Sequence, residues 1–249
     1  MAITVLVSGS KGRMGQEVIK AVNAADGLEL VGGVDLGDDL DQALASAAPQ
    51  VMVDFTVPES ALGNIRTALA RKVVPVVGTT GLSADDRDEV AALCRKYATG
   101  CLIAPNFALG AVLMMRFAQE AARYFPDAEV IEMHHEKKLD APSGTAALTA
   151  ELIAQGRTQP PTQLPAGAFE KLPGARGANG AGDVPVHSVR LPGFVASQMV
   201  ILGGPGQTLT IRHDSIDRAC FMPGVIHAVR QVDRLAGSGD LIYGLEHLL

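Results

Sequence analysis

The residues best suited to catalysis or ligand binding occupy positions 132–146, with the sequence EMHHEKKLDAPSGTA. The first nine of them include two histidines and two lysines, although the whole chain has a net charge of −6. Residues 142–145, Pro-Ser-Gly-Thr, precede a helical run, so they should present backbone N–H groups at a positive helix end. A carboxylate would bind there with help from the Thr145 hydroxyl, while His135 and Lys138 would meet a second carboxylate or the reacting group. The segment therefore suits a small dianionic substrate.

Each part of this segment also has an interpretation without catalysis. Adjacent histidines on a regular strand point to opposite faces, so either His134 or His135 would then be a surface or core residue. For the same reason the pair chelates poorly, and we expect no metal site formed with Glu136. Residues 143–145 would otherwise serve only as a helix cap, and the two lysines only as a solvated charge pair.

Charged and titratable side chains outside this segment carry weaker signals. Arg176, Arg190 and Arg212 are each interpreted as a surface or interface charge. Four histidines stand apart from any motif, so core or surface roles are the default for them: His187, His213, His227 and His247.

The sequence Gly-Ser-Lys-Gly-Arg-Met-Gly at residues 9–15 predicts a phosphate-binding loop. A strand pattern precedes it and a helix pattern follows it, and its glycines allow backbone N–H groups to approach a pyrophosphate. Asp35 ends the next strand pattern, 20 residues after Gly15, where a carboxylate can accept hydrogen bonds from ribose hydroxyls. The spacing G-x-x-G-x-x-G departs from the strict fingerprint, so the alternative interpretation is a glycine-rich turn without a ligand.

The charges near this loop bear on which nicotinamide coenzyme would bind. Asp35 favours NADH because a carboxylate repels the 2′-phosphate of NADPH, and Leu36 offers no cation for that phosphate. Lys11 and Arg13 could supply the positive charge instead, so we predict that the protein uses both NADH and NADPH. A second turn, Gly-Thr-Thr-Gly at residues 78–81, follows a later strand pattern, where ligands collect in open α/β sheets.

Hydrophobic patterning predicts the elements that position these residues. In the first part of the chain, short apolar runs alternate with helical patterns, which predicts a parallel sheet covered on both faces. Pro75 has no backbone N–H to donate to a neighbouring strand, so its own strand should be irregular or lie near an edge of the sheet. Ser83 should cap a helix, with Asp86 three residues further on. The expected strands are residues 3–7, 28–34, 51–56, 73–77 and 101–104, and the expected helices are 14–25, one from 58, and 83–97.

After residue 105 the pattern changes in a way that favours a second domain. Residues 159–186 are rich in proline and glycine and predict a long surface loop or lid. A turn of glycines and a proline at 203–206 joins two strand patterns as an antiparallel hairpin, which predicts a mixed sheet. The expected helices are residues 109–124, 146–154 and 223–235, and the expected strands are 129–133, 186–191, 199–202 and 208–212.

The composition of the 249-residue chain restricts the class of protein. Hydrophobic residues make up 47% of it, enough for a sizeable core, and no apolar run approaches the length of a membrane span. With 21 basic against 27 acidic residues and 4% aromatics, nucleic acid is not the expected partner. The three cysteines form no C-x-x-C pattern, so neither a disulfide framework nor a zinc site is expected. These features, with an N-terminus that lacks the basic flank of a signal peptide, predict a cytoplasmic globular protein.

Five motifs that occur in order along the chain resemble those of the dihydrodipicolinate, or 4-hydroxy-tetrahydrodipicolinate, reductase family. They are Gly9-x-x-Gly-Arg-Met-Gly15, Val53-Asp-Phe-Thr56, Gly78-Thr-Thr-Gly81, Ala104-Pro-Asn-Phe107 and His134-His-x-x-Lys-x-Asp-Ala-Pro-Ser-Gly-Thr145. The resemblance covers essentially the whole chain, and the last motif is highly specific. It implies NAD(P)H-dependent reduction of 4-hydroxy-tetrahydrodipicolinate to tetrahydrodipicolinate, a step of bacterial diaminopimelate and lysine biosynthesis.

The resemblance also implies a role for each motif. His134 would be the proton donor or acceptor and Lys138 the proton donor. His135, Gly144 and Thr145 would bind the substrate, and no metal would be needed. The residues implied for coenzyme binding are Gly9, Ser10, Lys11, Gly12, Arg13, Met14, Asp35, Gly78, Thr79, Thr80, Ala104, Pro105, Asn106 and Phe107.

The architecture implied is a Rossmann-type α/β nucleotide domain, residues 1–105 and 217–249, and an α+β domain, residues 106–216. The second domain would bind the substrate and form a homotetramer through its mixed sheet. Leu36 stands where some members carry an arginine for NADPH, and Glu136 adds negative charge near the dianion. Two rival interpretations are another nicotinamide-dependent dehydrogenase that acts on an imine, and a non-enzymatic NAD(H) sensor, which would need a recognition module.

Overall fold

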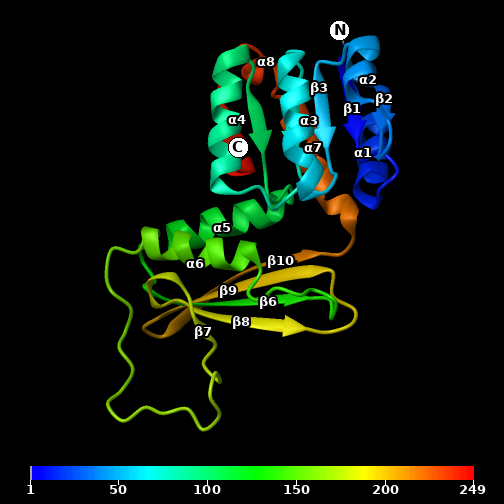
Figure 1. The fold of residues 1–249 in the computed structure, drawn as a ribbon. Helices are drawn as coiled ribbons and strands as arrows, with labels where there is room; N and C mark the ends of the chain where they lie inside the picture. Colours follow the sequence, from blue (N-terminus) through cyan, green and yellow to red (C-terminus); the bar gives the residue numbers. More distant parts are fainter. Residues whose placement is uncertain (1) are drawn as a thin grey trace. The chain divides into compact units, whose positions relative to one another are not determined.

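The computed structural model describes residues 2–249, which form two compact units. One unit contains the chain up to Leu109 together with Arg218–Leu249, and the other is Gly110–Asp217. Each unit has its own sheet, the first with six strands and the second with five (Figure 1). The predicted fold class, a Rossmann-type parallel sheet plus an α+β part with a mixed sheet, is confirmed.

The first unit is built on a parallel sheet with the strand order β11-β5-β4-β3-β1-β2. Its strands are β1 (Ile3–Ser8), β2 (Leu28–Val34), β3 (Val51–Asp54), β4 (Val74–Val77), β5 (Cys101–Ile103) and β11 (Leu241–Tyr243). Its helices are α1 (Arg13–Ala24), α2 (Leu40–Ala47), α3 (Pro58–Ala70), α4 (Ala84–Tyr97), α7 (Met222–Val229) and α8 (Val232–Leu235), with 3-10 turns η2 (Arg218–Phe221) and η3 (Leu245–Leu248).

The core of this unit lies between the sheet and its helices. Strands β3, β4 and β5 are buried at every position, as expected for parallel strands covered on both faces. Ile65 of α3 and Val90 of α4 belong to one buried cluster with Val77 of β4. The predicted cap of α4 is confirmed, because the Ser83 hydroxyl accepts the Asp86 N–H and the Asp86 carboxylate accepts the Ser83 N–H.

The prediction that the Pro75 strand is irregular or near an edge was wrong, because β4 lies between β3 and β5 inside the sheet and pairs with β3 without a register shift. Backbone N–H groups of successive strand residues point to alternate sides, and the Val74 N–H donates to Gln50 on the β3 side. The nitrogen of Pro75 therefore faces β5. The ladder with β5 starts only at Val76, so the missing proline donor removes no ladder hydrogen bond.

The second unit is built on a mixed sheet with the strand order β10-β9-β6-β8-β7. Only the β6–β8 pair is parallel among the ladders of this sheet in residues 2–249. Helices α5 and α6 lie over one of its faces (Figure 1). The elements are α5 (Leu109–Ala121), β6 (Asp127–His134), α6 (Gly144–Gly156), β7 (Ala178–Asn179), the 3-10 turn η1 (Ala181–Asp183), β8 (Pro185–Arg190), β9 (Ala196–Gly204) and β10 (Gln207–Ser215). The predicted antiparallel hairpin is confirmed as β9–β10.

Two predicted segments differ from the structure. The loop predicted for 159–186 ends earlier, because β7, η1 and the start of β8 occupy its last residues. The residues of β7 and η1 are exposed and show no regular spacing of apolar side chains, so the sequence pattern did not indicate them. The helix predicted for 223–235 is divided into α7 and α8, with the Gln231 N–H bonded to the Ala228 carbonyl in a tighter turn. The apolar faces of α7 and α8 are both buried, so the spacing of apolar residues in the sequence did not show the break between the two helices. Helix α2 and the three-residue strand β11 were not predicted.

Among residues 2–249, no helix is both long enough and apolar enough to cross a lipid bilayer.

Candidate active site

The carboxyl edge of the parallel sheet carries every residue predicted to bind the coenzyme. Residues 9–12 follow β1, Asp35 follows β2, residues 78–80 follow β4 and residues 104–107 follow β5. Arg13 and Met14 begin α1. Since neighbouring parallel strands end at the same edge, the tertiary structure brings these segments together where ligands of open α/β sheets bind.

The glycine loop after β1 has no room for side chains at two of its glycines. A Cβ on Gly15 would lie 2.0 Å from the Gly9 carbonyl oxygen, and a Cβ on Gly9 would lie 2.4 Å from the Phe55 carbonyl oxygen. Gly9 also has a φ of +80°, and its carbonyl accepts the Gly12 N–H at 3.0 Å. Lys11, Gly12 and Arg13 are exposed at the tip of this turn. The glycines thus fold a tight backbone cradle at the start of α1, which fits a pyrophosphate.

Asp35 is fixed next to this loop by backbone hydrogen bonds. Its carboxylate accepts the Leu36 N–H at 2.8 Å and the Lys11 N–H at 2.7 Å, and these two bonds lower the Asp35 pKa. Asp35 therefore carries a negative charge near neutral pH. The Lys11 ammonium lies 4.0 Å from the Asp38 carboxylate, and the Leu36 side chain is 95% exposed.

A buried polar network below this edge was missed by sequence reasoning. Asp54, at the end of β3, is 0% exposed and accepts hydrogen bonds from the hydroxyls of Thr79 (2.7 Å) and Thr56 (2.8 Å) and from the Asn64 amide (2.7 Å). The Thr79 hydroxyl in turn accepts the Thr56 N–H. The side chain of Thr79, predicted to bind the coenzyme, is thus engaged inside the protein, whereas Thr80 is exposed. The resemblance had marked residues 53–56 only as a motif.

Aromatic packing fixes the turns after β4 and β5. A Cβ on Gly78 would lie 2.1 Å from the Phe55 ring, and this ring packs against the buried Phe107 ring at a centroid distance of 5.8 Å. Asn106 accepts the Ala108 N–H through its side-chain oxygen at 2.8 Å, which holds the turn. Of the predicted residues here, Ala104 and Phe107 are buried and Pro105 is exposed.

In the second unit, the predicted substrate residues flank one strand end and one helix start. His134 is the last residue of β6, and Gly144 and Thr145 form the first turn of α6, two residues earlier than predicted. Ser143 caps the helix, with its hydroxyl accepting the Ala146 N–H at 3.2 Å. The first turn of α6 has the positive partial charge that favours an anion.

Glu132 connects these two parts. Its side chain is 0% exposed, and its Oε2 lies 2.5 Å from His134 Nδ1. Arg190 of β8 donates to both Glu132 oxygens at 2.7 and 2.8 Å, and the Ser143 N–H donates to Oε1 at 3.2 Å. The interpretation of Arg190 as a surface or interface charge was wrong: β8 pairs with β6 in a register that sets Arg190 beside His134, and its side chain is 19% exposed.

The environment sets the charges of this network. Burial alone would raise the pKa of the Glu132 carboxyl, but hydrogen bonds from Arg190, Ser188 and His134 outweigh it and lower the pKa to about 2. Burial lowers the pKa of His134, against the opposing effect of Glu132. At neutral pH the network therefore contains a carboxylate, a guanidinium and a neutral imidazole.

Lys138 lies in the loop that follows β6. Its ammonium donates to both oxygens of Asp140 at 2.7 and 2.9 Å, and this contact lowers the pKa of the Asp140 carboxyl. The Lys138 side chain is 21% exposed, whereas that of Asp140 is 64% exposed. His135 is exposed, and its carbonyl accepts the Lys138 N–H at 3.2 Å. A dianionic ligand would offer Lys138 carboxylates in place of Asp140.

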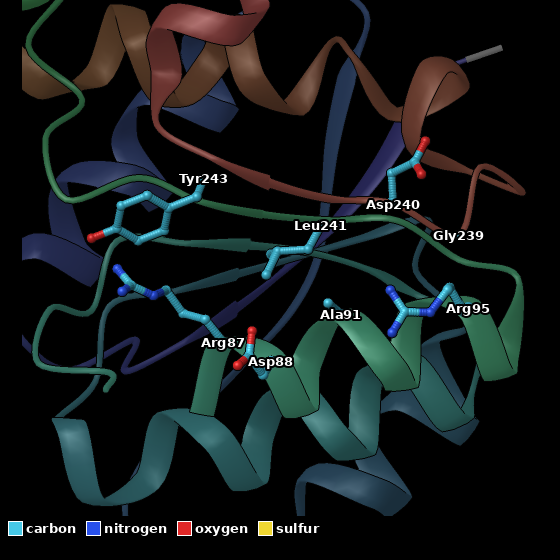
Figure 2. Close-up of a pocket in the computed structure, with 8 residues that line it drawn as sticks. All are labelled: Arg87, Asp88, Ala91, Arg95, Gly239, Asp240, Leu241 and Tyr243. Atoms are coloured by element: carbon cyan, nitrogen blue, oxygen red, sulfur yellow. The ribbon is translucent and has the colours of Figure 1, made fainter. Parts of the chain in front are cut away.

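A hollow of about 510 Å³ lies elsewhere in the first unit, between α4 and the strand β11 (Figure 2). The Arg87 guanidinium lies 4.5 Å from the centre of the Tyr243 ring, and Arg95 and Asp240 line the other end. None of the predicted site residues lines this hollow.

Comparison with known proteins agrees with the motifs along the chain. Residues 3–107 match the family model described as "Dihydrodipicolinate reductase, N-terminus", and residues 110–249 match "Dihydrodipicolinate reductase, C-terminus". The chain is 50% identical over 267 residues to the 4-hydroxy-tetrahydrodipicolinate reductase of Moorella thermoacetica, with 99% of this chain and 98% of the relative covered. It is 46% identical over 274 residues to the 4-hydroxy-tetrahydrodipicolinate reductase of a Synechocystis strain, with 99% of this chain and 98% of the relative covered.

The fold is also similar to solved structures. The dipicolinate-bound dihydrodipicolinate reductase from Paenisporosarcina sp. TG-14 has a TM-score of 0.89 and 41% identity, and all of both chains is covered. An amine dehydrogenase from Mycobacterium smegmatis has a TM-score of 0.59 at 14% identity over 93% of this chain and 92% of its own, which shows a shared fold alone. Because the family models and full-length relatives cover nearly every residue, the chain belongs to the dihydrodipicolinate reductase family.

Proposed function

We propose that this chain reduces 4-hydroxy-tetrahydrodipicolinate to tetrahydrodipicolinate with NADH or NADPH, and that the residues described above carry the reaction. The relatives named for this activity share 44–50% identity over nearly the full chain. The observation that carries the residue assignment is the hydrogen-bonded arrangement of His134, Glu132 and the start of α6. The chain is therefore an oxidoreductase of diaminopimelate and lysine biosynthesis.

The first unit supports a nicotinamide coenzyme. The pyrophosphate would lie over the glycine loop, because side chains are excluded at Gly9 and Gly15 and backbone N–H groups begin α1. The anionic Asp35 would accept ribose hydroxyls, and Lys11 and Arg13 would attract a 2′-phosphate. When bound, the coenzyme supplies the hydride.

The second unit supports a small dicarboxylate. One carboxylate would bind the first turn of α6 through Gly144 and Thr145, and His135 and Lys138 would meet the other. The neighbour from Paenisporosarcina holds dipicolinate, a planar diacid of this kind. Fixing both carboxylates orients the ring, and orientation of this kind can contribute several kcal/mol to lowering the barrier.

The reaction consumes one hydride and one proton and releases the 4-hydroxyl group as water. Lys138 is the proton donor in our proposal, since its ammonium already lies in a largely shielded position against Asp140. His134 is the second proton-exchanging group, with a neutral ring before the substrate arrives. The rival activity, a dehydrogenase that acts on an imine, has support only at the level of the fold, because the amine dehydrogenase shares the architecture at 14% identity.

Titration with pyridine-2,6-dicarboxylate tests this assignment. We expect calorimetry to show binding that is strong in the presence of NADH and weak without it. Replacing Thr145 with valine should lower the affinity for the diacid and leave the affinity for NADH unchanged. Equal diacid affinity for the variant and the wild type would remove the start of α6 from the substrate site.

A second experiment separates the reductase from a dehydrogenase that acts on an imine. The loss of NADH absorbance at 340 nm is measured with the pathway substrate and, separately, with 2-oxo acids plus ammonia. We expect the loss with the pathway substrate only.

Replacing Asp35 with alanine should shift coenzyme preference from NADH toward NADPH. The ribose hydroxyls of NADH would lose a charged acceptor, and the repulsion of a 2′-phosphate would disappear. Loss of one hydrogen bond to a charged group corresponds to roughly tenfold or more in the ratio of kcat/KM for the two coenzymes. The measurement is that ratio for both proteins, and an unchanged ratio would place the ribose away from Asp35.

The proposal extends to the whole assembly. Residues 1–105 and 217–249 would be the nucleotide domain, and residues 106–216 the substrate and tetramerisation domain. The family resemblance supports a homotetramer formed through the mixed sheet and a cytoplasmic location. Sedimentation equilibrium of the full chain tests the oligomeric state, for which a mass near four chains is expected.

A further inference from the structure

Glu132 is a buried carboxylate that contacts two charged or titratable side chains, His134 and Arg190. It is 0% exposed and lies two residues before His134 on the same face of β6, so its Oε2 reaches His134 Nδ1 at 2.5 Å. Both of its oxygens also accept a hydrogen bond from the guanidinium of Arg190. This fork fixes the position and plane of the carboxylate.

We propose that Glu132 is a positioning residue that holds His134 in the tautomer with the proton on Nδ1 and ties this ring to the start of α6. The inference rests on the proposed role of His134 in the reaction. An ionised carboxylate can only accept hydrogen bonds, so the ring nitrogen that faces it must carry the proton. In the neutral ring Nε2 then holds the lone pair, and it is the atom that gains or gives up a proton.

A second contact extends the role of Glu132 to the predicted carboxylate-binding turn. Its Oε1 accepts the Ser143 N–H at 3.2 Å, and Ser143 caps the helix whose first turn contains Gly144 and Thr145. One carboxylate therefore contacts both the proton-exchanging ring and the residue that begins the anion-binding turn. A shift of Glu132 would displace both groups relative to a bound diacid.

The charges around His134 determine the direction of the expected pH effect. Glu132 from β6 is the negative group in contact with the ring, and it favours the protonated form. Arg190 from β8 and Lys138 from the following loop oppose protonation, and burial opposes it more strongly. Asp140 is paired with Lys138. Loss of the Glu132 charge should therefore lower the pKa of His134 further.

The test replaces Glu132 with glutamine, which keeps the shape and removes the charge. We expect kcat to fall roughly 10²-fold, because a partner that orients a catalytic histidine is lost, with the KM for NADH changed less than about twofold. The limb of the pH profile that reports His134 should move to lower pH. Side-chain ¹⁵N and ¹³C resonances of His134 should change from the Nδ1–H tautomer to a mixture.

The matched control is Glu129→Gln. Glu129 lies on the same strand and also contacts a histidine of β8, with 2.9 Å between its Oε2 and His187 Nε2. This variant also removes one negative charge from β6, and it should leave kcat, the pH profile and the His134 resonances unchanged. Equal losses in both variants would show a general effect on the sheet and overturn the proposal.

The wild-type protein provides a test that needs no variant to fold. Its His134 ring should show a protonated Nδ1 and an unprotonated Nε2 above the pKa of the ring, and the opposite tautomer would overturn the inference. His134→Gln separates the two proposals. Unchanged kcat in His134→Gln refutes the proposed catalytic role, whereas a reduced kcat there with normal Glu132→Gln activity refutes only the positioning role.

Discussion

Replacing Lys138 with alanine should lower kcat by roughly 10²–10⁴-fold, the range for loss of a general acid. The ammonium of Lys138 is the proposed proton donor, and the alanine side chain can neither donate a proton nor attract the dianion. The KM for the dicarboxylate should rise as well, because one cation of the site is lost. The affinity for NADH should change little, since all predicted coenzyme residues belong to the first unit. Steady-state kinetics and an NADH titration measure both quantities.

Lys137→Ala is the matched control for this prediction. Lys137 is the adjacent residue, carries the same charge and is exposed, and within residues 2–249 its side chain has no hydrogen-bond or ion-pair partner. We expect its removal to change kcat less than about twofold. If Lys138→Ala remains active and loses NADH binding instead, the assignment of Lys138 to proton transfer is wrong.

A Gly15→Ala substitution should weaken NADH binding by about 10²-fold, the size of effect that a displacement of about 1 Å produces in a positioned site. The new Cβ would lie 2.0 Å from the Gly9 carbonyl oxygen, so the backbone of the loop must move. Overpacking of this kind also costs about 1–3 kcal/mol of the free energy of unfolding. Fluorescence titration with NADH and urea denaturation give the two numbers.

Gly63→Ala serves as the control for the glycine loop. Gly63 lies inside α3, and a Cβ there would meet no atom within 4 Å apart from its chain neighbours and the nearby backbone of the same helix. Alanine is the better helix former, so the variant should be up to about 1 kcal/mol more stable and bind NADH normally. Wild-type NADH affinity in Gly15→Ala would mean that the pyrophosphate does not lie on this loop.

Sequence patterns predicted the local elements well where one period or one cap governs them. The apolar run of β2 ends at Val34 as predicted, and Ser83 caps α4 with Asp86. Prediction failed where a long-range partner decides the outcome. Pro75 is tolerated inside the sheet because β5 pairs only from Val76 onward, and no property of residues 73–77 shows where β5 begins.

The sequence by itself determined which chemical groups the protein has and how they are grouped along the chain: the glycine loop, Asp35, and the segment from His134 to Thr145. Such motifs are short, so turn chemistry and helix caps place their residues together without help from distant parts of the chain. The family followed from the order of these motifs.

Only the tertiary structure decided which partner each buried polar group has. Arg190 reaches Glu132 across 58 residues of sequence, and Thr79 reaches Asp54 across 25. A buried carboxylate must find donors, but strand order and register determine which donors are near, and these depend on the packing of the whole sheet. The sequence pattern therefore showed Arg190 as one more surface charge, whereas the pairing of β6 with β8 sets it beside His134.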